Sequence, residues 1–282
     1  MPSPSYWKEY VMTDKHTKNI VDIGNLNLNC NVTGPLDAPW VTVAHSLATD
    51  MTMWEPQLSV LSQHFRVLSF DARGHGGSGI PNGPSAMIDL VDDVLRLWDR
   101  LSIDCSHFIG LSMGGMTGIG VALKAPSRVQ SLVACDCRLD APLFFKNMWD
   151  QRIEAVNNGS MQDILEQTMA TWFTQQCLDT GGEIVDKVRQ MILNTDAEGY
   201  ITCVEALKGL NYKSSLATVI VPTLYVVGDQ DGLHPDEMAE FAKLTPDAEF
   251  VILDNAAHLS NMEQPSMFNR SVLKFLLDVN DK

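Results

Sequence analysis

The sequence predicts an α/β fold with a mainly parallel, doubly wound sheet and an inserted helical cap. Three observations indicate this. Short apolar runs typical of buried strands alternate with stretches of helical periodicity, a glycine-flanked serine follows one of these runs, and residues 138–214 interrupt the alternation with helical patterns only. We therefore expect a core formed by residues 1–137 and 215–282, and a helical cap formed by residues 138–214.

Length, composition and charge exclude several classes of protein. The chain has 282 residues, of which 45% are hydrophobic, and this suits a globular protein with a large core. Its net charge of −15 disfavours nucleic acid and anionic membranes as partners. No apolar run reaches the ~20 residues that span a bilayer, and the first ten residues lack the pattern of a secretory signal. We expect a cytoplasmic protein, with homo-oligomerisation left open.

The first half of the chain opens with a predicted hairpin and then alternates. Residues 20–30 alternate in polarity around Gly24-Asn25, which is typical of a β-hairpin. The glycine-rich segment 71–78 predicts a loop. The other expected elements are a strand at 41–44, a helix at 53–61, a strand at 65–70, a helix at 87–101 and a strand leading to Gly110.

After the serine turn, a helix and a strand at 131–135 precede the predicted cap, and alternation then resumes. Residues 219–221 and 223–227 flank Pro222 and together predict one later strand. The remaining expected elements are a helix at 239–243, a strand at 249–253 and a helix at 267–277. Strands alternating with helices imply right-handed parallel crossovers.

The segment Gly110-Leu111-Ser112-Met113-Gly114 has the G-x-S-x-G pattern of a nucleophile elbow. Such a turn presents the Ser112 hydroxyl above the sheet and directs the Met113 amide at any negative charge forming there. The flanking glycines avoid clashes with the neighbouring strand and helix. A simple Gly-Ser turn would give the same pattern. The two interpretations are distinguished by whether the chain also offers a base and an acid as partners for Ser112.

A serine nucleophile needs a base and an orienting acid, which we sought in loops after the strands. His258 follows the last predicted strand and is the best candidate base, with His234 as a rival. Asp231 follows the preceding strand and is the preferred acid, with Asp136 and Asp229 as alternatives. The chain order Ser, Asp, His is that of the α/β-hydrolases.

Two amide donors would be needed to bind a tetrahedral oxyanion. One is the amide of Met113, and we expect the other from Leu47, in the loop after the early strand at 41–44. The alternative is that this loop only packs against Trp54. The six cysteines show no zinc-ligand spacing, and we expect the chemistry to require neither a metal nor a cofactor.

Several segments resemble the bacterial 3-oxoadipate enol-lactonases. The similarity runs from about residue 25 to 277 and includes the segments His45-Ser46-Leu47-Ala48-Thr49-Asp50, Trp172-Phe173-Thr174, Glu198-Gly199-Tyr200 and Ala257-His258-Leu259-Ser260. The resemblance implies Ser112, Asp231 and His258 as a catalytic triad, and Leu47 and Met113 as oxyanion donors. His45 stands where asparagine is common in that family, and Ala48 replaces a glycine.

The resemblance also implies a substrate, namely a small carboxylated lactone, and a place in aromatic catabolism. Trp149 and Arg152 occupy the place of a Trp-x-x-Arg pair in the enol-lactonases, and arginine suits bidentate binding of a carboxylate. Trp172 is a candidate for lining the pocket. Arg152 could equally be a solvated helix residue, and Trp172 could be part of the core of the cap.

The most direct interpretation is therefore a serine hydrolase that opens a small lactone or ester through an acyl-enzyme. A general carboxylesterase or lactonase and a carbon–carbon bond hydrolase of the same fold are the enzymatic alternatives. The non-enzymatic alternative is a ligand receptor with an intact triad, because fold alone does not establish turnover.

Overall fold

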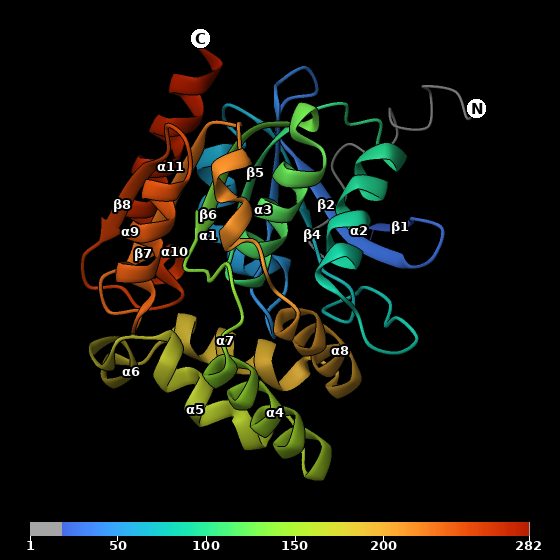
Figure 1. Ribbon diagram of the computed structural model, residues 1–282, viewed down its shortest axis with the longest axis vertical. Coiled ribbons are helices and arrows are strands. Elements are labelled where there is room, and N and C mark those ends of the chain that lie inside the picture. Colours follow the sequence, from blue (N-terminus) through green and yellow to red (C-terminus); the bar gives the residue numbers. More distant parts are fainter. Residues whose placement is uncertain (1–18, 282) are drawn as a thin grey trace.

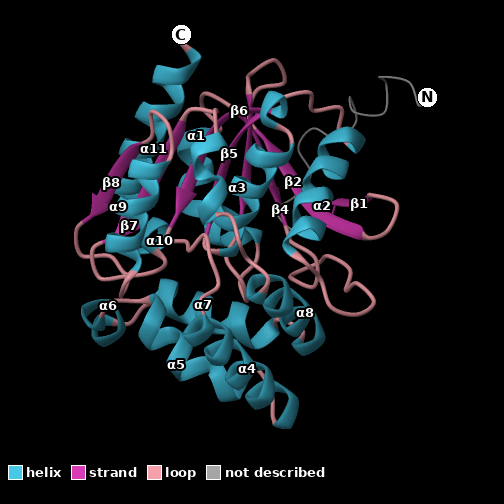
Figure 2. Cartoon of the chain, viewed as in Figure 1, coloured by secondary structure: helices cyan, strands magenta, loops and turns pink. Residues whose placement is uncertain are grey.

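A computed structural model describes residues 19–281, in which eight strands form one sheet (Figures 1 and 2). The strand order is β1-β2-β4-β3-β5-β6-β7-β8; β2 is antiparallel to β1 and β4, and the remaining pairs are parallel. The segment 1–18, in which we expect no secretory signal, and residue 282 lie outside the described residues. The predicted α/β fold with a mainly parallel sheet is confirmed.

The strands coincide closely with the apolar runs. The central strands are apolar along nearly their whole length because helices cover both faces of a parallel sheet. Their bounds are β1 Asn19–Asp22, β2 Asn27–Thr33, β3 Trp40–Ala44, β4 Arg66–Phe70, β5 Ser106–Leu111, β6 Val129–Cys135, β7 Thr223–Gly228 and β8 Glu249–Leu253.

Helices cover the two faces of this sheet, as successive residues of β5 show. Phe108 packs against Trp98 of α2, whereas the ring of its neighbour His107 is hydrogen-bonded to Asn280 of α11. Adjacent strand residues point to opposite faces, so α2 and α11 lie on opposite sides. The helices of the core are α1 Glu55–Leu61, α2 Met87–Arg100, α3 Met113–Lys124, α9 His234–Leu244, α10 Ser260–Glu263 and α11 Pro265–Asn280.

The prediction of a strand at 219–221 was wrong. Val219 follows a short 3-10 helix, η4 Lys213–Thr218, and strand pairing begins only at Thr223. Pro222 lacks an N–H donor and contributes only its carbonyl, which accepts the amide of Leu132. The helix expected at 239–243 is longer than predicted, because Pro235 suits the first turn of α9.

Five helices separate β6 from β7 in the sequence and form a layer below the sheet in Figure 1. They are α4 Leu143–Asn158, α5 Gln162–Trp172, α6 Gln175–Thr180, α7 Glu183–Asn194 and α8 Ala197–Lys208. We refer to α4–α8 as the helical layer. That this layer is a cap, separated from the core at residues 138 and 214, stays a prediction.

The helical layer is held closely against the loop that follows β4. A Cβ atom added to Gly199 of α8 would lie 2.0 Å from the carbonyl oxygen of Gly74, so the two backbones touch. The Cys203 thiol lies 3.3 Å from the carbonyl oxygen of Arg73. Only glycine permits this approach, and the contact fixes one end of the layer to the core.

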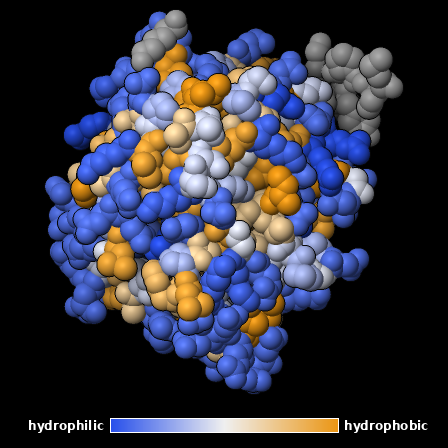
Figure 3. Space-filling model, viewed as in Figure 1, coloured by the Kyte–Doolittle hydropathy of each residue, from blue (hydrophilic) through white to orange (hydrophobic). Residues whose placement is uncertain are grey.

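The surface in Figure 3 is mixed, with small hydrophobic groups among hydrophilic residues. The exterior of the helical layer in this view is mostly hydrophilic. Among residues 19–281, none of the helices has the length and apolar character needed to cross a membrane.

Candidate active site

Ser112 lies at a sharp turn between β5 and α3. Its backbone has φ 55° and ψ −116°, a strained conformation for a residue with a side chain. The turn is held from both sides, because the Ser112 amide donates to the Cys135 carbonyl and the Ser112 carbonyl accepts from Met116. Strain of this kind persists only where the surroundings fix it, and it is common at catalytic positions.

Two flanking glycines make this turn possible. A Cβ atom on Gly110 would lie 2.1 Å from the carbonyl oxygen of Gly114, and one on Gly114 would lie 2.1 Å from the carbonyl oxygen of Ala44. The neighbouring atoms belong to the backbone, which cannot move far enough to relieve such a clash. The glycines therefore allow β5, α3 and the end of β3 to meet directly beneath the serine.

Asp231 is the carboxylate that contacts His258. Its Oδ2 atom lies 2.9 Å from Nδ1 of the imidazole, and both side chains are buried. The two rival carboxylates have other partners. Asp229 accepts the amide of Ala256, and Asp136 accepts the amide of Gly228 and contacts the hydroxyl of Ser260. Bonded in this way, Nδ1 faces Asp231, and Nε2 is left to accept a proton.

The surroundings of the two buried carboxylates, Asp231 and Asp136, shift their pKa values in opposite directions. Burial alone would raise the pKa of Asp231, but the neighbouring imidazoles of His258 and His234 hold that pKa below its ordinary value. Burial and the nearby charge of Asp231 raise the pKa of Asp136 well above its ordinary value. The surroundings therefore favour the ionised form of Asp231 and disfavour ionisation of Asp136.

The two candidate oxyanion donors are the amides of Leu47 and Met113, and both residues are buried. In the described part of the chain, neither amide donates a hydrogen bond. Buried amides without a partner are rare, and one of these two directly follows the strained serine, an arrangement that suits an anionic ligand. Next to Leu47, Ala48 has φ 56°, a left-handed conformation that favours glycine and is uncommon for a residue with a side chain.

Two buried histidines hold the loop that carries Leu47. Nε2 of His75 accepts the amide of Ala48 at 2.9 Å, and its Nδ1 donates to the carbonyl of Arg73. In return, Nε2 of His45 accepts the amide of Ala72 at 2.8 Å. Burial and the neighbouring His45 lower the pKa of His75 to about 3, so the ring stays a neutral acceptor.

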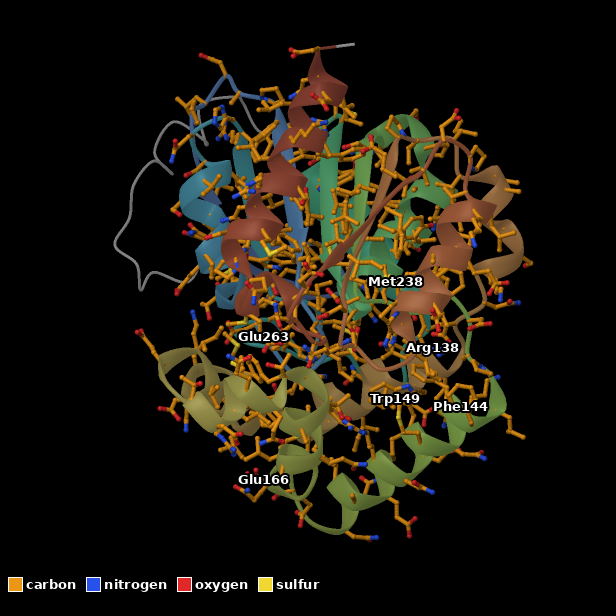
Figure 4. All side chains as sticks on the ribbon, turned by 90° about the vertical axis from the view of Figure 1, so that its left-hand side faces the viewer. Arg138, Phe144, Trp149, Glu166, Met238 and Glu263 are labelled. Carbon is orange, nitrogen blue, oxygen red and sulfur yellow. The ribbon has the colours of Figure 1, made fainter. Side chains whose placement is uncertain are left out.

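The helical layer places aromatic and cationic side chains near this site. The ring of Trp172 stacks on that of His258 with centroids 6.1 Å apart. Arg152 lies over the ring of Trp149 and donates to the Thr168 hydroxyl. In Figure 4, Trp149 lies on the side of the layer that faces the sheet, whereas Glu166 lies on the far side.

Three buried polar atoms of the helical layer have no hydrogen-bond partner: Nε1 of Trp149, Nε of Arg152 and the hydroxyl of Tyr200. Burial raises the pKa of Tyr200, and the nearby charge of Arg152 opposes this rise. Buried donors are normally satisfied, so a group of unpartnered donors suits an acceptor-rich ligand such as a carboxylate.

Residues 39–265 match the profile of a family described as having the alpha/beta hydrolase fold. The chain belongs to the α/β-hydrolase family. This α/β-hydrolase is 31% identical to 3-oxoadipate enol-lactonase 1 of Acinetobacter baylyi over 258 residues, which cover 91% of this chain and 96% of that protein. The resemblance inferred from the oxyanion loop and the cap segments is therefore confirmed.

Two solved structures extend the comparison. The enol-lactonase from Burkholderia xenovorans LB400 matches with a TM-score of 0.88 and 32% identity, covering 92% of this chain and all of that one (100%). A thermophilic esterase from Thermogutta terrifontis matches with a TM-score of 0.85 and 29% identity, covering 90% and 94%. The α/β-hydrolase thus shares its fold with proteins named for lactone and for ester substrates.

Sequence patterns alone did not reveal every residue at this site. His45 and His75 make crossed hydrogen bonds between two loops, and these bonds depend on the adjacency of β3 and β4, which no local pattern indicates. Tyr200 was noted only as part of a matching segment. No periodicity or spacing signals an unpartnered hydroxyl, which is a property of packing.

Proposed function

We propose that this α/β-hydrolase opens a small lactone or ester through an acyl-enzyme, and that 3-oxoadipate enol-lactone is the leading substrate. His258 takes the proton of Ser112, whose oxygen attacks the substrate carbonyl. The amides of Leu47 and Met113 hold the oxyanion. Water activated by His258 then releases the acid. For an enol-lactone, the leaving enolate becomes a ketone, and this favours ring opening.

One observation carries the proposed chemistry: Asp231 holds Nδ1 of His258 at 2.9 Å, and the strained Ser112 is followed directly by the buried, unpartnered amide of Met113. The enol-lactonase and esterase relatives support the same reaction class. No metal or cofactor is needed for these steps. The free cysteines, several of them buried, agree with the expected cytoplasmic location.

Replacing the serine tests the chemistry. We expect Ser112→Ala to remove nearly all turnover, leaving only the ~10³–10⁴-fold acceleration over water that binding and the oxyanion site supply. A serine-directed phosphonate should add its mass to the peptide that contains Ser112 in the wild type and not in the variant. Full activity of Ser112→Ala would exclude a serine hydrolase.

The substrate depends on a different part of the molecule. We propose that Arg152, together with Trp149 and Tyr200, binds the carboxylate of the substrate, while Trp172 lines the pocket beside His258. The unpartnered donors of this group support the assignment. An arginine donates in a planar fork that matches a carboxylate, and buried charge-assisted bonds are strong.

A substrate panel of carboxylated lactones, neutral lactones and short esters tests this assignment. We expect Arg152→Ala to raise KM for carboxylated lactones and to leave neutral esters nearly unchanged, since only the former lose an ion pair. Arg189→Ala is the matched control, because Arg189 pairs with Glu166 on the far side of the helical layer. If the wild type opens neutral substrates far better than carboxylated ones, a general esterase or lactonase is the correct assignment.

A further inference from the structure

A second histidine shares the carboxylate of the candidate triad. Oδ2 of Asp231 lies 2.9 Å from Nδ1 of His258 and 3.3 Å from Nδ1 of His234. The ligand-type atoms of the three residues all lie within 4.8 Å of one another. The chemistry proposed above uses His258 and Asp231 and leaves His234 without a role.

We propose that Asp231, His234 and His258 bind Zn²⁺ and that the bound metal switches the hydrolase off; the inhibition, unlike the binding, rests on the proposed function. Zinc accepts imidazole nitrogen at about 2.0–2.1 Å and carboxylate oxygen at about 2.0–2.2 Å. Ligand atoms of a tetrahedral site are then separated by roughly 3.3 Å. The observed separations from Asp231 are within a few tenths of an ångström of that value.

The three side chains also differ in exposure in a way that suits metal entry. The side chain of His234 is 21% exposed, whereas those of Asp231 and His258 are 2% and 9% exposed. A metal ion can therefore meet His234 first and be passed to the buried pair. Two imidazoles and one carboxylate, with water in the fourth position, form a recognised zinc ligand set.

Binding at this position would change the tautomer of His258. A neutral imidazole that holds a metal through Nδ1 carries its proton on Nε2. The proton displaced from Nδ1 of His258 moves to Nε2, which can no longer accept the proton of Ser112. Nδ1 of His234, which donates to the Asp231 carbonyl in the structure, would pass its proton to its own Nε2 in the same way. Because the metal would lie on the Asp231 side of the ring, substrate can still bind. We expect kcat to fall while KM changes little.

Zinc chloride is the probe, and binding is measured first without substrate, by competition with a chromophoric chelator. We expect the wild type to bind Zn²⁺ and to lose ester or lactone turnover over the same concentration range, with recovery on adding EDTA. His234→Gln should need at least about tenfold more zinc for both effects, since even outer-shell partners are worth ten- to hundredfold in affinity. His64→Gln controls for loss of an exposed histidine elsewhere.

Two results would overturn the proposal even where zinc binds. One is equal zinc affinity in the wild type and His234→Gln, and the other is a rise in KM with kcat unchanged. If the protein shows no lactone or ester turnover but binds zinc in a His234-dependent manner, the proposed function fails while the metal site stands. Absence of zinc binding with normal turnover removes only the metal site.

Discussion

Asp136 and Asp231 are buried in the same site, and their surroundings separate their roles. Both follow strands that end beneath His258, so position along the chain does not distinguish them. The contacts do, because Asp231 bonds to His258 whereas Asp136 joins Gly228 to Ser260. A carboxylate that orients a histidine must stay ionised, and one that only connects two loops need not.

Replacing each carboxylate by its amide should therefore lower turnover to very different extents. Asp231→Asn should lower turnover by about 10⁴-fold, because an amide can donate to Nδ1 and favour the wrong tautomer. Asp136→Asn should change turnover much less, since an amide can still accept from Gly228 and donate to Ser260. Steady-state kinetics of the two variants checks this, and a severe defect in Asp136→Asn alone would reassign the acid.

The raised pKa of Asp136 also predicts a pH dependence of stability. A carboxyl whose folded pKa lies above the unfolded value of about 3.9 stabilises the fold at low pH, and this contribution is lost as pH rises through the folded pKa. Asparagine does not titrate. The free energy of unfolding of Asp136→Asn relative to wild type should therefore increase from about pH 4 to about pH 7. Urea unfolding at the two pH values measures it, and no change between them would contradict the prediction.

At the scale of elements, the loops after β3 and β4 form one unit. His45 and His75 exchange bonds between them, and the Asp71 carboxylate accepts the amide of Met51. The loop that carries Leu47 is therefore positioned by its neighbour rather than by its own sequence. The second loop is in turn held against α8 of the helical layer at Gly74.

Two amide substitutions test the hydrogen bond that Nε2 of His75 accepts from the Ala48 amide. The side-chain amide of glutamine reaches the position of Nε2, whereas that of asparagine reaches only Nδ1. We expect His75→Asn to lower kcat by about tenfold or more with KM nearly unchanged, approaching the ~10²–10³-fold cost of losing an oxyanion donor. His75→Gln should restore part of this loss.

The matched control is His107→Gln, because His107 is also a buried histidine whose pKa burial lowers, to about 4, but it lies near the end of α11. It should lower the melting temperature without lowering kcat. If His75→Asn and His107→Gln lose stability alike and neither changes kcat, His75 has only a structural role.

At the scale of the whole molecule, the negative net charge of the protein disfavours the approach of the proposed anionic substrate. The net charge of −15 repels an anionic lactone over distances that salt shortens, from about 30 Å at 0.01 M to about 10 Å at 0.1 M. An arginine inside the pocket acts at contact distance and is screened little. The two effects therefore respond differently to ionic strength.

We expect kcat/KM for the carboxylated lactone to rise as salt increases from about 0.01 M to about 0.1 M, because long-range repulsion is screened. A neutral ester of similar size should show no such rise and serves as the control. A fall in kcat/KM with salt for the carboxylated substrate would mean that exposed cations, rather than Arg152 at contact distance, attract it.

The sequence alone determined the order of strands and helices, the glycine-flanked serine and the helical interruption between β6 and β7, because periodicity and glycine placement are local properties. It was wrong at 219–221, where a proline removed a donor that a strand would use. It left Asp136 and Asp229 as alternatives to Asp231 and His234 as a rival to His258, and it did not identify His75 or Tyr200 as parts of the site. Those residues meet only when parallel strands bring distant loops to one edge of the sheet, and the contacts that separate them exist only in the folded chain.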